Sequence, residues 1–110
     1  LRRIRTSAPD LGTLDFGDLK ILPDQGQIIV NGKTTHLTRT EFQLLVELAS
    51  APGRVFSREE LLERVWGKDY FGDGRLVDVH VRRLRKKIEP EDTKPQYVIT
   101  VRGFGYKLKN

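Results

Sequence analysis

Short runs of alternating apolar and polar residues mark the part of the chain that follows residue 12. The apolar positions of these runs are Leu14, Phe16, Leu19, Ile21, Ile28 and Val30. Turn-forming residues interrupt them at 23–26 and at Asn31-Gly32, and an Asn-Gly pair is a strong signal for a tight hairpin. The pattern predicts a small antiparallel sheet over residues 13–37. Residues 1–12 show no periodicity and are predicted to be a linker.

The pattern then changes to helical spacing, and two helix starts share one design. Thr38 with Glu41, and Ser57 with Glu60, have the spacing of a capping box, in which the first side chain caps the helix and the second reaches back to it. Each box is flanked by apolar residues at the two positions of a hydrophobic staple. These are Leu37 and Phe42 for the first box and Phe56 and Leu61 for the second. Two consecutive helices are therefore predicted.

Each of these two helices is expected to bury one face. The first is predicted to run to about residue 51, before Pro52-Gly53, and the second to about Trp66. The residues expected to face inward are Phe42, Leu45, Val46 and Ala49 in the first helix and Leu61, Leu62, Val65 and Trp66 in the second. A loop rich in Gly and Asp follows at 67–74.

A third helix is predicted over residues 75–88, where apolar and cationic residues separate onto opposite faces. On a helical wheel, the apolar stripe consists of Val77, Val81, Leu84 and Ile88. The opposite face carries Arg75, Val79, Arg82, Arg83 and Lys86. Two strands at 97–101 and 105–108, joined near 102–104, complete the pattern. A small sheet, three helices and a terminal hairpin together indicate an α+β fold class.

The positive charge of the chain is concentrated in this third helix. The 110 residues are of a size for one domain, with a net charge of +5 and a pI near 9.7. Between residues 75 and 87 six cations accompany a single anion, Asp78, so this segment alone accounts for the excess. Solvated helix faces normally mix charges of both signs. A basic face almost free of acids therefore favours a polyanionic partner.

The size of the third helix favours double-stranded DNA as that partner. At about 1.5 Å per residue the helix is about 21 Å long, and it fits a major groove roughly 12 Å wide. Arginine can bind guanine or phosphate through paired hydrogen bonds, and Val79 can touch a thymine methyl. Asp78 is expected to pair with Arg82 one turn later. Two interpretations of His80 stay open, a packed surface residue or a phosphate contact.

The tip of the terminal hairpin is a second candidate contact. Gly103 and Gly105 would let the backbone approach another surface closely. Arg102 then either enters a DNA minor groove, where cations are attracted, or is simply exposed. The two glycines do not make a nucleotide-binding loop, because a third glycine and a following helix are missing.

Composition argues against several other classes of protein. The chain has no Cys, which excludes disulfides and Cys-based metal sites and fits a reducing cytoplasm. His36 and His80 are its two histidines, and no metal, P-loop or nucleophile motif is present, so neither an enzyme nor a cofactor is predicted. No apolar stretch approaches the roughly 20 residues of a membrane helix. The composition is that of a globular protein.

Several segments together resemble the OmpR/PhoB family of response-regulator output domains. The helical segments that carry the resemblance are Leu37-Thr38 with Glu41-Phe42, Ser57-Arg58-Glu59 with Leu61-Leu62, and Val65-Trp66-Gly67. The third helix, 75–88, and the hairpin, 100–106, carry it further, and the match covers about residues 13–108. The resemblance implies a winged helix-turn-helix domain at 13–110. Its parts would be a four-stranded amino-terminal antiparallel sheet, a three-helix core and a carboxy-terminal wing.

The resemblance also implies roles for individual residues. Those expected at bases or the groove floor are Arg75, Leu76, Val79 and Arg83. Those expected to hold phosphates are His80, Arg82 and Arg85. Those expected to support or touch the DNA backbone are Trp66, Thr100 and Tyr106, whereas Arg102 would probe the minor groove. Leu76 departs from the Thr of some members, which leaves the base preference at that position open.

Further partners follow from the same resemblance. Residues 67–74 correspond to a segment that contacts RNA polymerase in several relatives, which makes Asp69, Tyr70, Phe71 and Asp73 a candidate surface. Family members typically bind direct repeats as head-to-tail dimers after a receiver domain is phosphorylated in a two-component phosphorelay. Leu1-Arg2-Arg3 looks like the end of such a receiver domain. The phosphoacceptor would lie in that receiver domain, outside the present sequence.

Three alternatives to a response regulator are separable by experiment. Turnover of a phosphodiester would indicate an enzyme. A preference for single-stranded RNA would indicate an RNA-binding or protein-binding winged helix, although an exposed aromatic platform is missing from the basic face. A transmembrane helix in the flanking sequence would indicate a membrane-tethered regulator.

Overall fold

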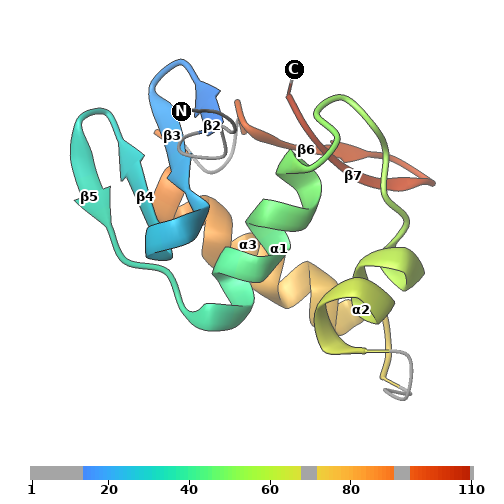
Figure 1. The fold of residues 1–110 in the computed structure, drawn as a ribbon. Coiled ribbons are helices and arrows are strands. Elements are labelled where there is room, and N and C mark those ends of the chain that lie inside the picture. Colours follow the sequence, from blue (N-terminus) through green and yellow to red (C-terminus); the bar gives the residue numbers. More distant parts are fainter. Residues whose placement is uncertain (1–13, 68–71, 91–94, 110) are drawn as a thin grey trace, which may run out of the picture. The chain divides into compact units, whose positions relative to one another are not determined.

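The computed structural model describes residues 14–67, 72–90 and 95–109. The chain divides into two compact units, residues 1–36 and residues 37–110 (Figure 1). The expected linker, residues 1–12, lies outside the described residues. Within those residues, no helix is both long enough and apolar enough to cross a membrane.

The first unit contains a four-stranded antiparallel sheet in the order β2-β3-β4-β5. Its strands are β2 Leu14–Phe16, β3 Leu19–Leu22, β4 Gln27–Val30 and β5 Lys33–Thr35. Between β4 and β5, Asn31 and Gly32 have φ angles of 51° and 79°, as the two central residues of a type I′ turn require. The predicted sheet and its Asn-Gly hairpin are confirmed. The turn predicted at 23–26 is a 3-10 helix, Pro23–Gln25, which ends at Gly26 with φ 63°.

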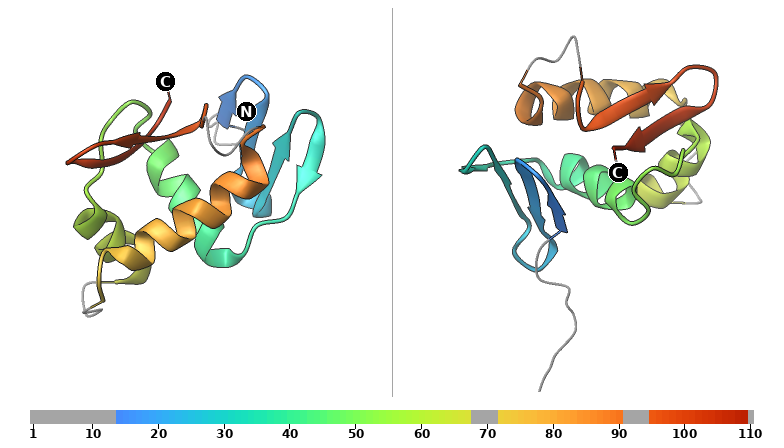
Figure 2. Two further views of the ribbon diagram at one scale, coloured as in Figure 1. Left: turned by 180° about the vertical axis from the view of Figure 1, so that it is seen from behind. Right: turned by 90° about the horizontal axis from the view of Figure 1, so that it is seen from above.

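The second unit consists of three helices followed by a two-stranded hairpin. The helices are α1 Arg39–Ala49, α2 Arg58–Trp66 and α3 Arg75–Ile88, and the hairpin strands are β6 Val98–Val101 and β7 Gly105–Leu108. Figure 2 shows α3 and the hairpin side by side. The order of elements is the predicted one, and the predicted bounds of α3 are confirmed.

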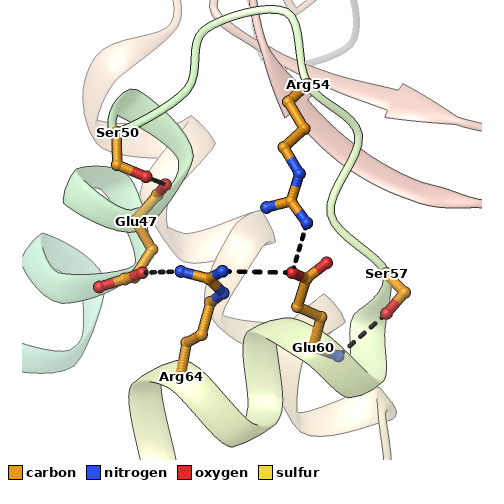
Figure 3. Close-up of polar contacts among 6 residues, drawn as sticks. All are labelled: Glu47, Ser50, Arg54, Ser57, Glu60 and Arg64. Atoms are coloured by element: carbon orange, nitrogen blue, oxygen red, sulfur yellow. Dashed lines mark hydrogen bonds and ion pairs between the residues drawn. The ribbon is translucent and has the colours of Figure 1, made fainter.

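The two predicted capping boxes form to different extents. At α1, the Glu41 N–H donates to Thr38 Oγ1 at 3.2 Å, and the Thr38 N–H donates back to the Glu41 carboxylate at 3.0 Å. At α2, the Glu60 N–H donates to Ser57 Oγ at 3.0 Å (Figure 3). The Glu60 carboxylate bonds Arg54 at 2.6 Å, and the main-chain N–H of Ser57 contributes a weaker interaction that helps to lower the pKa of Glu60. The second prediction is therefore confirmed for the cap, whereas the complete box forms at α1.

The inward face of α1 differs from the predicted one. Its buried residues are Glu41, Leu44, Leu45, Leu48 and Ala49, whereas Phe42 and Val46 are only half-buried. The buried acid on this face, Glu41, is satisfied there because its carboxylate bonds Thr38 and, at 2.7 Å, the Lys87 ammonium of α3. Burial alone would raise the pKa of Glu41, but Lys87 and Thr38 outweigh it and lower that pKa.

The inward faces of α2 and α3 follow the prediction more closely. Leu61 and Leu62 of α2 are buried, whereas Val65 and Trp66 are half-buried. All four residues of the predicted apolar stripe of α3 are buried, namely Val77, Val81, Leu84 and Ile88. Because this stripe anchors one side of α3, its opposite side is left exposed.

Candidate nucleic-acid interface

The exposed face of α3 carries the cations that the sequence placed there. Arg75, Arg82, Arg83 and Lys86 are exposed, and Val79 among them is 44% exposed. Within the described ranges, Arg82, Arg83 and Lys86 have no ion pair or hydrogen bond through their side chains. Arg75 pairs loosely with Asp73 at 3.4 Å, and both of these side chains are exposed. The face is therefore a positively charged surface with little compensation.

Asp78 does not pair with Arg82, so that prediction is wrong. Its carboxylate lies 2.9 Å from the Arg58 guanidinium of α2, and it accepts a hydrogen bond of 2.6 Å from the Tyr106 hydroxyl of β7. Arg58 also donates to the carbonyl of Gly74, just before α3, at 3.3 Å. Asp78 lies on the flank of α3 toward these two elements, whereas Arg82 is on the exposed face. The one acid of the helix is thus drawn away from its cations.

Tyr106 is a hydrogen-bond donor of β7, paired with Thr100 one position from the pair that closes the hairpin turn. Its side chain is buried, and burial together with the Asp78 carboxylate raises the pKa of Tyr106 to about 12. The hydroxyl therefore keeps its proton at neutral pH and its bond to Asp78 persists. Tyr106 links the hairpin to α3 from within the protein.

The side chain of Arg85, in the last turn of α3, reaches across to β6. Its Nε and Nη2 donate to the Val98 carbonyl at 3.1 and 2.8 Å, and Nη2 also donates to Thr100 Oγ1 at 2.6 Å. The guanidinium lies 5.6 Å from the centre of the Tyr106 ring. Burial lowers the pKa of Arg85, but an arginine still remains a cation. Much of its donor capacity is engaged inside the protein, unlike that of Arg82 and Arg83.

Glu89 is a functional candidate that sequence reasoning missed. This buried carboxylate, directly after α3, accepts hydrogen bonds from the N–H groups of Gln96, Tyr97 and Val98 at 2.7–3.2 Å. A signal was present in the sequence, since an acid at a helix carboxyl end opposes the helix dipole and calls for a partner elsewhere.

The hairpin tip exposes Arg102, Gly103 and Phe104, and Phe104 is 72% exposed. The tip turn is closed by the Phe104 N–H, which donates to the Val101 carbonyl at 2.9 Å, and Gly103 has φ 84°.

The other glycine of the hairpin, Gly105, approaches the protein's own backbone. A Cβ on Gly105 would lie 2.0 Å from the Phe56 carbonyl oxygen, and the residue has φ 151°. Phe56 and Tyr106 exchange two main-chain hydrogen bonds, of 2.8 and 2.9 Å, in an isolated β-bridge. The backbone at Gly105 therefore does approach another surface closely, and that surface is the protein's own connection between α1 and α2.

His80 and Trp66 lie together at the flank of α3. Their rings meet edge to face, with centroids 5.1 Å apart. His80 Nδ1 lies 2.9 Å from the Leu76 carbonyl oxygen, which can only accept a hydrogen bond, so Nδ1 carries a hydrogen. The other ring nitrogen, Nε2, is not part of this bond. Both residues are half-buried, as is Leu76.

Of the residues predicted to contact RNA polymerase, the structure describes Asp73. Asp69, Tyr70 and Phe71 lie outside the described residues. Asp73 is exposed, and its carboxylate accepts a hydrogen bond of 3.0 Å from the Arg75 N–H at the start of α3. Among the described residues, no three side chains of His, Asp or Glu gather as a metal site requires.

Three helices, of which the last presents a cationic face, followed by a β-hairpin that is hydrogen-bonded to that helix, define a winged-helix domain. Residues 32–108 match the family model described as "Transcriptional regulatory protein, C terminal". The chain belongs to this family, as an output domain of OmpR/PhoB type.

Curated and solved relatives agree with this assignment. The chain is 52% identical, over 104 residues, to the transcriptional regulatory protein CseB of Streptomyces avermitilis, which covers 94% of this chain and 42% of CseB. The response regulator DrrB of Thermotoga maritima, described as an OmpR/PhoB homologue, superposes with a TM-score of 0.84 at 39% identity, over 90% of this chain and 45% of that one.

A third relative was solved on DNA. The RstA DNA-binding domain of Klebsiella pneumoniae, in complex with the RstA box, superposes with a TM-score of 0.80 at 38% identity, over 88% of this chain and 96% of that one. The present chain spans about two fifths of the length of the curated relatives it matches.

Proposed function

We propose that this chain binds double-stranded DNA at specific sequences, as the output domain of a two-component response regulator that controls transcription. The observation that carries the proposal is the cationic face of α3, on which Arg82, Arg83 and Lys86 are exposed without a partner in the described part of the chain. A solved relative at 38% identity holds DNA with the same fold. The full-length protein would act in the cytoplasm.

In this proposal α3 enters the major groove. Its buried stripe fixes the helix, so the opposite side chains can reach base edges and both phosphate walls. The residues assigned to bases or the groove floor are Arg75, Leu76, Val79 and Arg83. Arg82 and His80 are assigned to phosphates. Because Nδ1 of His80 donates to the Leu76 carbonyl, a bond to phosphate would come from Nε2 of the imidazolium form, in which both nitrogens donate.

The remaining assigned residues support this helix or extend its reach. Trp66, Thr100 and Tyr106 are assigned to supporting or touching the DNA backbone, and the buried Tyr106 would do so by support. Within the protein these three side chains contact His80, Arg85 and Asp78 of α3 respectively. Arg102 at the wing tip is assigned to the minor groove. Arg85, expected from the family to hold a phosphate, has two of its nitrogens bonded to β6, and we assign it first to fixing that strand.

Other functions in the proposal belong to the longer protein. A receiver domain would supply the phosphorylation switch, and head-to-tail dimers would bind direct repeats. Asp69, Tyr70, Phe71 and Asp73 are proposed to contact RNA polymerase.

Selection of binding sites from a random-sequence duplex pool, followed by anisotropy titrations in increasing salt, tests the proposal. We expect a motif in direct repeat and an affinity that falls steeply with salt. Replacing Arg82 and Arg83 together by alanine should abolish enrichment, whereas replacing Lys20 and Lys33, two exposed cations of the sheet, should preserve it. Salt-sensitive binding without enrichment would reduce the function to general nucleic-acid binding. Failure to bind any duplex would overturn the proposal in favour of a protein-binding role.

A further inference from the structure

Two side chains at the carboxyl end of α3, Arg85 in its last turn and Glu89 directly after it, bind both main-chain polar groups of one wing residue, Val98. The Glu89 carboxylate accepts the Val98 N–H at 2.9 Å, and Arg85 donates to the Val98 carbonyl at 2.8 and 3.1 Å. Arg85 lies in the last turn of α3, and Glu89 is the extended residue that follows the helix, so both side chains stand at its carboxyl end. Val98 is the first residue of β6 and is fully buried.

Hydrogen bonds from the same two side chains reach residues on either side of Val98. Glu89 also accepts the N–H groups of Gln96 and Tyr97, just before β6, and Arg85 also donates to Thr100 Oγ1 within it. The opposite edge of β6 is paired with β7, with Val98 opposite Leu108. The strand is therefore fixed between β7 on one edge and the side chains of Arg85 and Glu89 on the other, as a strand in the middle of a sheet would be.

We infer that Arg85 and Glu89 are positioning residues that set where the wing tip stands relative to the recognition helix, and so determine whether Arg102 reaches the minor groove while α3 occupies the major groove. This inference rests on the proposed function. Arg102 follows Val98 by four residues along the hairpin, about 13 Å at the usual rise of a strand. The hairpin has a second anchor nearer its tip, at Tyr106, which is bridged to Phe56 and bonded to Asp78. A displacement of Val98 would pivot the hairpin about this second anchor and so change where the tip points.

Glu89→Gln is the variant that tests this role with least disturbance of shape. Glutamine has the same size, but it is neutral, and it brings its own NH₂ donors to a site where main-chain N–H groups converge. The hold on Val98 should weaken while the four core residues of α3 stay in place. Glu63→Gln is the matched control, because Glu63 is an exposed residue of α2 and the change in charge is the same.

The decisive measurement is a double-mutant cycle with Arg102→Ala on the selected DNA site. We expect Arg102→Ala to weaken binding by about tenfold in the parent and in Glu63→Gln, which corresponds to one lost groove contact. In Glu89→Gln the same change should cost less than about threefold, because the wing no longer delivers Arg102 to its groove. The base preference of the α3 half of the site should be the same in all of these backgrounds.

The outcomes separate this inference from the function on which it rests. If the parent protein shows no sequence preference, the proposed function fails and the inference fails with it. If Arg102→Ala does not weaken binding by the parent, the proposed wing contact is wrong, and so is the inference. A tenfold effect of Arg102→Ala that persists in folded Glu89→Gln would overturn the inference alone.

If Glu89→Gln fails to fold, Arg85→Lys takes its place in the cycle. Lysine keeps the charge but cannot bond the Val98 carbonyl and Thr100 together through a planar fork. Amide hydrogen exchange provides a readout without DNA. The amides of residues 96–98 should exchange faster in Glu89→Gln than in Glu63→Gln, and unchanged protection would count against the hold.

Discussion

Arginines serve opposite purposes in two regions of the helical unit. Where α1 is connected to α2, Arg54 and Arg64 both contact the Glu60 carboxylate, at 2.6 and 3.4 Å, and Arg64 also bonds Glu47 at 3.1 Å (Figure 3). On the exposed face of α3, Arg82 and Arg83 have no such partner in the described part of the chain. The first region joins two cations to two anions, and the second leaves its cations uncompensated.

The difference shows that the number of arginines does not locate a binding surface. At the α1–α2 connection, the guanidinium groups of Arg54 and Arg64 also lie 4.3 and 5.3 Å from the centre of the Phe56 ring. A DNA phosphate would have to compete with these internal partners to bind Arg54 or Arg64. Among the residues that the structure describes, none competes with a phosphate for Arg82 or Arg83. The surface with unsatisfied charge is therefore the one available to a polyanion.

The largest expected effect on DNA binding comes from Arg83→Ala, which removes one uncompensated cation from the exposed face of α3. Loss of a base-reading arginine should weaken binding to the selected site by about 1–3 kcal/mol and relax the preference at one base position. Repeated site selection with the variant measures both. Arg54→Ala removes the same charge at the α1–α2 connection and should leave the selected motif unchanged. Equal losses on selected and random duplexes would contradict a base-reading role.

A smaller effect, of a different kind, is expected from Arg82→Ala. A phosphate contact carries no sequence information, so all duplexes should be weakened alike, and the slope of log affinity against log salt should fall by about one unit. Anisotropy titrations at several salt concentrations give that slope. The exposed cation Lys20 of β3 is the control, and Lys20→Ala should keep the parent slope. A loss confined to the selected sequence would assign base reading to Arg82 instead.

A third prediction concerns the link that draws Asp78 away from the cations of α3. The pKa of Tyr106 is raised from an ordinary value of 10.0 to about 12, so the folded state holds this proton more tightly than the unfolded state. Stability from this bond is therefore complete below pH 10 and is lost as pH rises toward about 12. Urea unfolding across that range should show a steeper decline for the parent than for Tyr106→Phe. Parallel curves for the two proteins would contradict the buried bond.

The smallest effect is expected at the α1–α2 connection itself. The hydrogen bond from Arg54, with further attraction from Arg64, lowers the pKa of Glu60 below its ordinary value of 4.5. The folded state therefore favours the carboxylate, and its contribution to stability is present above pH 4.5 and is lost as pH falls through the lowered pKa. Glu60→Gln should flatten this acid decline slightly, as measured by urea unfolding, and should not alter DNA binding. The exposed Glu63→Gln should keep the decline of the parent.

The sequence was most informative where one helix separates two kinds of residue. The bounds of α3 and its buried stripe were predictable because valine, leucine and isoleucine recur at helical spacing opposite the cations. The hairpin at Asn31-Gly32 was predictable because few residues accept two consecutive positive φ angles.

Contacts between elements distant in sequence were not predictable in this way. A local rule paired Asp78 with Arg82, but Arg58 and Tyr106 arrive from α2 and β7 and take its carboxylate. The burial of Glu41 on the inward face of α1 was missed for a similar reason, because its partner Lys87 lies 46 positions away. The contacts assigned to bases and phosphates stay predictions, since they depend on a partner outside the chain.

The bridge between Phe56 and Tyr106 has a consequence for the order in which the domain folds. It joins the segment before α2 to the last strand of the wing, and the closed loop contains both α2 and α3. Closing a long loop is entropically costly before other contacts reward it. We therefore expect the helices to associate first and the wing to dock late, so that substitutions at the bridge accelerate unfolding more than they slow folding. The element that finishes the DNA-binding surface would then also be the first to detach.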